Sequence, residues 1–516
     1  MIDIKQYPSI FNDVIGPVMI GHSSSHTAAS VRIGNVVRQL AYNKNVKKVK
    51  FSFDSKSSLA TTYKSQGSDI GLLAGILGFE TDDKRIPDAY EYTKEAGIDC
   101  IFEVKEIGEG HPNAYYIEFV SSDNKLYHLT ALSVGGGMIE ITDYMGFNIS
   151  VDGGFFETLI MCDDSDSKSI IHKINCELKH DYIINLSHKD EKSLINVKSK
   201  EELAFDFISI NSEIVQLHPI LPVMSQIDPK VPFITAKEIY CYAKGSNMSL
   251  YELAVLYESE RSGLSVDAII SKMNDIVKIL EMSIEATSSS EVKDRILQNQ
   301  SHLIEMNDNV IGGSFNKNII KYVTRFMDIK TSMGVFVAAP TAGSCGCISG
   351  CLFALKKELN LSNEKIAHAL LSSGLIGVII AHHSTFAAEV CGCQAECGVG
   401  SGMAAAVVAE ISGGSVKTCL GAASMALQNI LGLVCDPVGN KVEVPCLGKN
   451  ILAAFNAVAS ANMAVSGFDV VIPLDETISA LDSVGRSIPH ELRCTGLGGL
   501  STTKTSLEML ERFNAI

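Results

Sequence analysis

The sequence predicts an α+β protein of three units: a mixed α/β domain over residues 1–148, a small ferredoxin-fold module over 149–219 and an all-helical domain over 220–516. Two observations lead to this prediction. The chain has 516 residues, more than one hydrophobic core normally covers. The periodicity of its apolar residues also changes twice, from mixed helical and extended patterns to short alternating elements and then to helical patterns.

The first unit combines helical and extended patterns. Ser30–Leu40 has the spacing of a helix, Val49–Phe53 predicts a strand, and Ala114–Phe119 and Leu126–Ser133 predict a pair of strands. Three consecutive glycines, Gly135–Gly137, follow this pair. Glycine is the residue that accepts tight turns and close backbone approaches, so we expect one of these here.

The second unit alternates short elements in the order βαββαβ, which is the order of the ferredoxin-like fold. We expect these elements at Thr158–Cys162, Ser169–His180, Tyr182–Leu186, Leu194–Val197, Glu201–Ile208 and Glu213–Leu217. The module resembles an ACT domain, a small regulatory module often found on amino-acid enzymes. The sequence leaves open whether the module binds an effector and which one.

The third unit is predicted to be helical. Thr235 with Glu238, and Ser249 with Glu252, form two capping boxes that start helices in quick succession. After Ser401 the sequence is rich in Ala, Gly, Ser and Met and has few charges. Helices so rich in small residues pack closely and are usually buried on several sides.

The charge balance and the apolar segments exclude several classes of protein. The chain has 59 acidic and 43 basic residues, a formal net charge of −16, which argues against nucleic acid and anionic membranes as partners. Met1–Phe11 carries charges and is not a secretory signal. The most apolar stretch, Leu370–Ala381, is too short for a membrane span and predicts a buried helix. We therefore expect a cytoplasmic protein; the charge balance says nothing about a small-molecule substrate.

Cysteines concentrate in the C-terminal half, where ten of the 14 lie from Cys345 onward. In a reducing cytosol such a concentration favours metal binding or redox chemistry over disulfides, although free cysteine is also an ordinary core residue. Cys393 lies in a Gly-Cys-Gln-Ala-Glu segment, and prolines lie shortly after Cys435 and directly before Cys446. Three rigidly held thiolates fit an iron–sulfur cubane with one open iron, and three buried structural cysteines are the alternative.

A second candidate site lies near the N-terminus. The segment Ile15–Thr27 contains three consecutive serines between two histidines and leads into a helical pattern. Hydroxyls and backbone N–H groups at a helix N-terminus suit a carboxylate, and a serine-rich helix cap is the alternative interpretation. The residues concerned are His22, Ser23, Ser24, Ser25, His26 and Thr27.

These segments together resemble the iron–sulfur-dependent L-serine dehydratase family. Ile15–Thr27 is similar to the family signature Ile-Gly-Pro-Ser-Ser-Ser-His-Thr, with extra residues between the proline and the serines. The other blocks follow in the family's order and span nearly the whole chain. They are Ala339–Gly346, Gly392–Glu396, Gly432–Val438, Val444–Cys446 and Thr495–Leu500.

The resemblance implies that residues 1–148 are the family's β portion, fused through the ACT-like module to an α portion. It implies a [4Fe–4S] cluster that acts as a Lewis acid and is held by Cys393, Cys435 and Cys446. The implied reaction converts L-serine to pyruvate and ammonia, and a homodimer is expected. Substrate contacts are assigned to Ser23, Ser25, Thr27 and Asp69, and catalytic roles to His22, His26 and Ser24.

Several positions depart from the family pattern, among them His22, which stands where the family has the proline before its three serines. The family motif Lys-Gly-His-Gly-Thr-Asp is Lys64–Asp69 here, and Gln66 replaces its histidine, a candidate base. Glutamine accepts no proton at neutral pH. We therefore put forward the two histidines that flank the serines as the base. His382 and His383, which stand where asparagines are common in the family, offer further imidazoles.

Several alternatives stay open. Within the lyase class, the alternative substrates to L-serine are threonine, cysteine (with loss of sulfide) and another β-substituted amino acid. Outside this class, the alternatives are a non-catalytic amino-acid sensor and a pyridoxal phosphate enzyme, although no convincing lysine motif supports the latter. The remaining thiols near the predicted site are assigned to packing or to support of the ligands: Cys345, Cys347, Cys351, Cys391 and Cys397.

Overall fold

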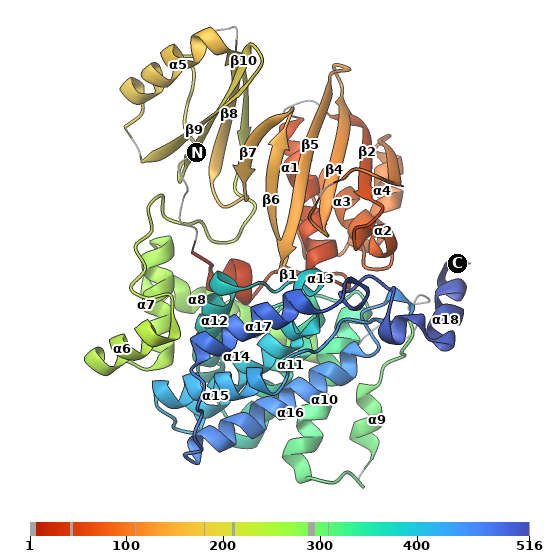
Figure 1. Cartoon of the computed structure of the whole chain (residues 1–516), viewed down its shortest axis with the longest axis vertical. Coiled ribbons are helices and arrows are strands. Elements are labelled where there is room, and N and C mark those ends of the chain that lie inside the picture. The colour runs from red at the N-terminus through yellow and green to blue at the C-terminus, as the bar shows by residue number, and fades with distance from the viewer. Residues whose placement is uncertain are drawn as a thin grey trace.

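The computed structural model describes residues 7–41, 45–108, 110–179, 181–208, 212–286, 295–307 and 309–514. Two sheet-containing units lie side by side above a larger helical body (Figure 1). The edges of the two sheets meet where the Ser187 hydroxyl donates to the Asn148 carbonyl at 2.5 Å. The predicted α+β class is confirmed.

The first unit is built on a six-stranded sheet with the order β3-β2-β4-β5-β6-β7, in which only β2 and β3 are parallel. Its strands are β2 (Val46–Asp54), β3 (Asp99–Lys105), β4 (Ala114–Ser121), β5 (Leu126–Gly135), β6 (Met138–Tyr144) and β7 (Phe147–Val151). Its helices are α1 (Ala29–Leu40), α2 (Leu59–Thr62), α3 (Ser68–Ile76) and α4 (Ala89–Glu95). The predicted helix and strands of this unit are confirmed. The boundary expected after residue 148 falls inside β7, which pairs with β6.

The glycine turn between β5 and β6 brings this sheet against the helical body. Gly135, Gly136 and Gly137 have φ angles of 105°, 61° and 89°, a region that side chains disfavour. A Cβ atom on Gly135 would lie 3.0 Å from the Ala387 backbone nitrogen. Both the turn and the close approach therefore require glycine.

The second unit has a four-stranded antiparallel sheet with the order β11-β8-β10-β9, which is the ferredoxin-like order. Its elements are β8 (Phe156–Asp163), α5 (Asp164–Glu177), β9 (Tyr182–Lys189), β10 (Lys192–Ser199) and β11 (Glu213–Leu217). The helix predicted over Glu201–Ile208 is wrong, because this stretch forms a loop and a turn. Leu203 and Phe205 are two residues apart, which suits an extended chain, and both pack into the module's core. The resemblance to an ACT domain stays a prediction.

The helical body follows residue 219. Its helices are α6 (Ala236–Ser246), α7 (Leu250–Ser262), α8 (Val266–Glu285), α9 (Ser301–Met306), α10 (Gly313–Thr331), α11 (Cys345–Leu359), α12 (Asn363–His383), α13 (Ala388–Cys391), α14 (Cys397–Ile411), α15 (Val416–Gln428), α16 (Cys446–Val465), α17 (Leu474–Ser487) and α18 (Lys504–Asn514). The two predicted capping boxes begin α6 and α7. Within the described part of this body, the one strand is β12 (Phe336–Val337).

One described helix, α12, is long and apolar enough to cross a membrane. Its apolar window is 78% buried inside the structure, and it packs against α7, α8 and α14. It is therefore a core helix, as predicted for Leu370–Ala381.

The N-terminal segment of the chain joins the two bodies. Ile10, Phe11 and Val14 pack into the core of the helical body, and the backbone N–H of Ile10 donates to Glu258 at 2.8 Å. The following strand β1 (Val18–Met19) pairs with β12. The serine segment that comes next therefore starts at the boundary between the helical body and the first sheet.

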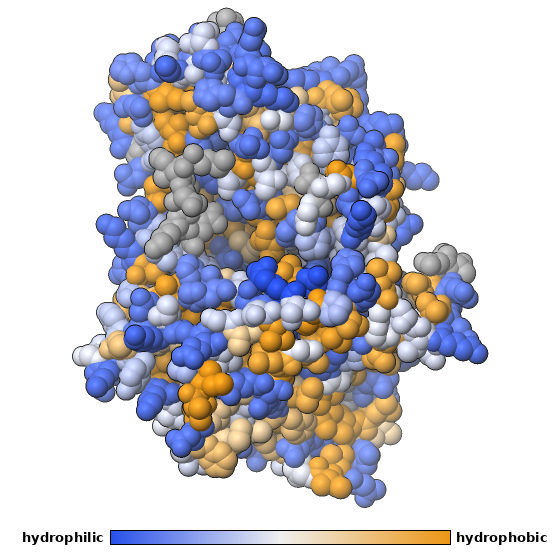
Figure 2. Space-filling view, viewed as in Figure 1, coloured by the Kyte–Doolittle hydropathy of each residue, from blue (hydrophilic) through white to orange (hydrophobic). Residues whose placement is uncertain are grey.

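The surface differs between the units. On the face in Figure 2, hydrophilic residues predominate over the upper units, whereas larger hydrophobic areas lie over the helical body. Exposed apolar side chains of this body include Leu452, Phe468 and Val471, the last of them 86% exposed.

Candidate functional site

The serine segment lies at the boundary between the first sheet unit and the helical body, and the helical body carries the predicted cysteine ligands. Three contacts cross this boundary. The backbone N–H of Ala342 donates to the Ser24 hydroxyl at 3.2 Å. His26 Nδ1 lies 3.6 Å from Glu389 Oε1, and Gln66 Nε2 lies 3.4 Å from the Cys494 sulfur. Segments far apart in the sequence thus form one buried site.

Most hydrogen bonds of the serine segment lie within the first unit. Ser23 caps the short helical segment that leads into α1 and accepts the His26 backbone N–H at 3.3 Å. The Ser25 carbonyl accepts the Ser133 hydroxyl at 2.7 Å, and the Thr27 hydroxyl donates to the Gln66 carbonyl at 2.9 Å. The segment is therefore a helix cap and also part of the boundary site.

His26 is fully buried, and both of its ring nitrogens have neighbours. Nδ1 lies 3.1 Å from the Ser23 hydroxyl, and Nε2 lies 2.9 Å from the Thr62 hydroxyl. Burial lowers the pKa of His26 to about 3. The imidazole is therefore neutral at physiological pH and is fixed in orientation by its hydroxyl neighbours.

His22 has a different environment. Its side chain keeps some exposure, yet burial lowers its pKa to about 3, and the charges of Lys441, Lys330 and Arg295 contribute to this shift. Three cations around a neutral imidazole create a positive local potential. This part of the site therefore suits an anion.

The predicted cluster cysteines come from three segments of the helical body. Cys393 begins a short helical turn after α13, Cys435 lies in a loop that pairs with Arg493, and Cys446 is the first residue of α16. Their exposed fractions are 3%, 6% and 7%. As the first residue of α16, Cys446 lies at a helix N-terminus. A helix N-terminus by itself favours a thiolate.

The three thiols are close enough to influence one another. A hydrogen bond to Cys494 and burial raise the pKa of Cys435 well above its ordinary value, and nearby Cys393 raises it further. Burial raises the pKa of Cys446 to about 12, and Cys393 again adds to the shift. The fold thus brings together the three cysteines that the family resemblance assigned to the cluster.

The donor set fits an iron–sulfur cluster. Thiolates are the ligands that such clusters take, and each binds a different iron atom. In the described ranges no three His, Cys, Asp or Glu side chains are placed to hold one metal ion. Cubane ligands stand further apart than the ligands of a single ion, so Cys393, Cys435 and Cys446 remain compatible with a cluster.

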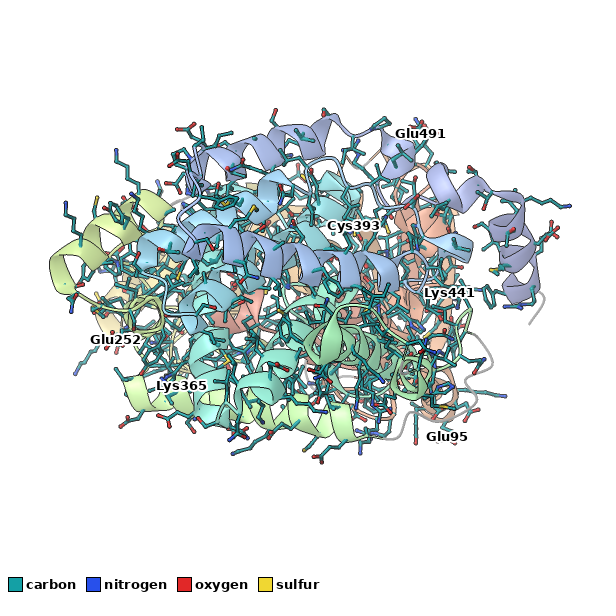
Figure 3. The ribbon with its side chains drawn as sticks, turned by 90° about the horizontal axis from the view of Figure 1, so that it is seen from below. Glu95, Glu252, Lys365, Cys393, Lys441 and Glu491 are labelled. Atoms are coloured by element: carbon teal, nitrogen blue, oxygen red, sulfur yellow. The ribbon has the colours of Figure 1, made fainter. Side chains whose placement is uncertain are left out.

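Buried cations surround the thiols. Lys449 donates to the Val434 carbonyl at 2.7 Å and to the Asp436 carboxylate at 2.8 Å. Burial lowers its pKa, but the neighbouring Cys393 and Asp436 outweigh burial and raise the pKa overall. Lys330, fully buried, donates to the Val442 carbonyl at 2.9 Å. In Figure 3, Cys393 lies near the centre and Lys441 lies between it and the C-terminal helix.

Sequence analysis missed the role of Cys494. Its backbone N–H donates to the Cys435 carbonyl at 2.9 Å, and its own carbonyl accepts the Ser58 hydroxyl at 2.8 Å. Gln66, the residue in place of the family histidine, points its amide at this thiol. The signal was present, because Cys494 directly precedes the family-like block that begins at Thr495.

Glu389 is the second residue that sequence analysis missed. Its carboxyl is 5% exposed and faces His26 from the helical body. Burial raises its pKa to about 7, with a further contribution from the negative charge of Glu396. It lies four residues before Cys393, where no pattern marked it.

Other candidates make different contacts. The Asp69 carboxylate accepts the Tyr90 hydroxyl at 2.9 Å and the Ile70 backbone N–H at 2.8 Å, contacts that lie within the first unit. His382 lines a separate cavity of about 230 Å³ together with Tyr7 and Asp13. Their predicted roles stay predictions.

Among the remaining thiols, Cys397 lies beside Cys393 and accepts the Asn450 amide at 3.6 Å, which fits its predicted supporting place.

Comparison with known proteins identifies similar chains. Residues 245–501 match the family described as serine dehydratase alpha chain. The chain is 33% identical over 282 residues to the probable L-serine dehydratase alpha chain of Bacillus subtilis (strain 168), which covers 54% of this chain and 94% of that protein. It is 41% identical over 159 residues to the probable L-serine dehydratase beta chain of the same strain, and this match covers 31% of this chain and 70% of that protein. It is 26% identical over 517 residues to the L-serine dehydratase of Helicobacter pylori (strain ATCC 700392 / 26695), and this match covers 96% of this chain and 98% of that protein.

Proposed function

Because the chain belongs to the L-serine dehydratase family, with the α and β portions fused in one polypeptide, we propose that it is an L-serine ammonia-lyase that releases pyruvate and ammonia. The observation that carries this proposal is the contact of the serine segment with the helical body that carries the three buried cysteines: Ser24 accepts from Ala342, and Ala28 packs in one cluster with Cys446. Relatives named L-serine dehydratase match nearly the whole length of the chain, which supports the same substrate.

The proposed cofactor is a [4Fe–4S] cluster held by Cys393, Cys435 and Cys446. When bound, it supplies a Lewis acid that polarises the β-hydroxyl of serine and makes water a better leaving group. The thiolate chemistry of the three residues and the cations around them support this assignment, because a cluster with three cysteine ligands carries net negative charge. Lys449 and Lys330 would offset that charge.

The serine segment would bind and orient the substrate. The hydroxyls of Ser23, Ser24 and Ser25 and the backbone N–H groups at the start of this helix are donors suited to the substrate carboxylate. Thr27 holds the Gln66 backbone and so fixes the opposite wall of the site. All of these residues except Ser23 are buried, so water is excluded from a bound amino acid.

The reaction needs a base to take the Cα proton. His22 and His26 are the predicted bases, and their position beside the serines supports the prediction. Retention of full turnover in His22→Ala and His26→Ala would remove this assignment. After elimination, the resulting aminoacrylate tautomerises and hydrolyses to pyruvate and ammonia.

The Gln66–Cys494 contact favours a second candidate within the same class. An amide and a thiol where the family has a histidine change the polar groups that face the substrate. The alternative substrates are threonine, cysteine and other β-substituted amino acids. Sulfide release from L-cysteine at a higher kcat/KM than pyruvate release from L-serine would identify a desulfidase instead.

The test is pyruvate release from L-serine, coupled to lactate dehydrogenase, with anaerobically purified protein whose iron and sulfide are counted. The expected result is turnover with about four irons per chain, the content of one cubane. A bound cluster would argue against the sensor, and a full cluster without pyruvate would mean a different substrate or a lost activity. A borohydride-sensitive yellow chromophore would support a pyridoxal enzyme. We further propose a cytoplasmic homodimer; sedimentation at one chain per particle would contradict the dimer.

A further inference from the structure

The boundary site contains buried polar atoms that have no hydrogen-bond partner. Oε2 of Glu389 and both side-chain atoms of Asn113 lack a partner within the described part of the chain. Asn113 is fully buried and Glu389 is 5% exposed. An unpaired polar atom in such a place costs free energy comparable to a lost hydrogen bond, so its persistence calls for a function.

The surroundings show that the two side chains belong to one place. The Asn113 amide lies near enough to Glu389 to lower the pKa of that carboxyl, although the two do not have the geometry of a hydrogen bond. The Asn113 carbonyl accepts the Ser133 backbone N–H at 3.0 Å, and the hydroxyl of Ser133 donates to Ser25. Ser25, Asn113 and Glu389 are therefore neighbours around His26.

The position of Glu389 is fixed by its flanks. Its short helix α13 follows Ala387, against which the Gly135 backbone packs, and it ends two residues before Cys393. The carboxyl is thereby held between the serine segment and the proposed cluster ligands. One of its oxygens faces His26 and the other is unpaired.

We propose that Glu389 is the catalytic base of this chain and takes the Cα proton of the substrate through its unpaired oxygen Oε2. His26 holds the other oxygen and is a positioning residue. This inference rests on the proposed lyase function and replaces its histidine base. Asn113 is the neighbouring amide that orients the substrate amino group.

The chemistry of the pair supports this division of roles. A general base is most effective when its pKa lies near the working pH. Burial raises the pKa of Glu389 to about 7 and lowers that of His26 to about 3, which leaves the imidazole a weak base. Gln66 at the family position of the base has no proton-accepting group.

The Cα–H bond breaks, its proton moves to the Glu389 carboxylate, and its electron pair becomes the Cα–Cβ double bond as the Cβ–O bond breaks. The hydroxide that leaves takes up the proton held by Glu389, which restores the carboxylate and releases water. The products are water and 2-aminoacrylate, and no oxidant or reductant is needed.

The experiment compares Glu389→Gln, Glu389→Asp and wild-type protein, all purified anaerobically with iron and sulfide counted. We expect the glutamine variant to keep about four irons per chain and to bind L-serine within about threefold of wild type by calorimetry. Its kcat should fall by about 10³-fold, because general base catalysis contributes about 10²–10⁴-fold. The aspartate variant should recover part of this loss.

A second readout follows the proton itself. In D₂O, wild-type protein should exchange or remove the Cα proton of serine, whereas Glu389→Gln should do neither, as seen by NMR of the substrate. Glu364→Gln, a carboxyl 73% exposed on α12, is the matched control and should behave as wild type.

Other outcomes overturn the inference. Serine affinity that falls more than tenfold with kcat nearly unchanged would make Glu389 a binding group for the substrate ammonium. Wild-type kcat in Glu389→Gln would remove it from the reaction. Loss of iron in both Glu389 variants would assign the residue to the integrity of the site. Failure of the proposed function is distinct, because wild-type protein would then release no pyruvate.

Discussion

The two halves of the boundary site differ in charge. Around the cysteines, the buried cations Lys330 and Lys449 lie among the thiols, and Lys441 and Arg295 add to the positive potential at His22. Around His26 and Glu389, burial is the main cause of both pKa shifts, and the further contribution to Glu389 comes from another carboxyl. One half is thus suited to anions, and the other keeps a carboxyl basic mainly because the carboxyl is buried.

This difference separates two tasks that would interfere at one place. A cation beside Glu389 would lower its pKa and weaken it as a base, whereas the absence of cations beside the thiols would leave an anionic cluster uncompensated. The family fold meets both needs because the cysteines come from the ends and loops of the helical body, while His26 belongs to the sheet unit. The predictions below test this division.

The largest effect is expected from removal of a ligand in the cationic half. Cys435→Ser should lose the proposed cluster and with it more than about 10³-fold of turnover, because three thiolates are the whole of the proposed protein ligand set. Iron and sulfide analysis and the visible absorption of the cluster measure this. Cys419→Ser, a buried thiol in α15, is the control and should keep about four irons per chain.

Cys494→Ser sharpens the same comparison. With three ligands in place it should keep its iron, since Cys494 contacts Gln66 rather than completing the proposed set. A variant that lost iron would make Cys494 a fourth ligand.

Removal of a cation should have the next largest effect. Lys449→Met takes away a buried positive charge and leaves the Asp436 carboxylate without its ion-pair partner. Because a charged hydrogen bond contributes about 1.5–3 kcal/mol, iron should be lost to a chelator about tenfold faster or more than in wild type. Lys365→Met, at an exposed position, is the control. Equal chelation rates in the two variants would mean that the cations do not stabilise the bound cluster.

In the half around His26 and Glu389, the buried carboxyl should lower the free energy of unfolding. The pKa of Glu389 is raised from 4.5 to about 7 in the folded chain, so folding is penalised once pH rises above 4.5, and fully so above about 7. Glu389→Gln should therefore raise the free energy of unfolding at pH 8 by about 3 kcal/mol and less at pH 5.5. Denaturant unfolding at both pH values measures this. The titratable groups that face this carboxyl are His26, Glu396 and Tyr115. Equal changes in the free energy of unfolding at both pH values would contradict the raised pKa of Glu389.

The smallest change is expected at Gln66, one of the positions that depart from the family pattern. Gln66→His restores an imidazole but should alter turnover of L-serine by less than about tenfold, because Glu389 carries the proton. Steady-state kinetics with L-serine and L-cysteine measure it. A hundredfold rise with L-serine would instead make residue 66 the place of the base.

The sequence allowed the fold class and most elements to be predicted, because apolar periodicity and capping boxes are local signals. The helix predicted over Glu201–Ile208 is wrong because apolar residues at short spacing also suit a loop packed on a core. The three cysteines were proposed as ligands, and the serine segment as a substrate site, through resemblance, because spacing alone did not distinguish the cysteines from packing thiols. Glu389 and Cys494 were missed because their roles depend on contacts with His26 and Gln66, which only the tertiary structure brings together.

The contact between Ala342 and Ser24 joins residues 318 positions apart. During synthesis, the first sheet unit therefore leaves the ribosome long before its partner half of the site exists, and the site is assembled last. Where α and β chains are separate polypeptides, as in the similar Bacillus subtilis proteins, the same contacts would have to form between subunits. Fusion turns that concentration-dependent association into an intramolecular step, with the ferredoxin-like module as the tether.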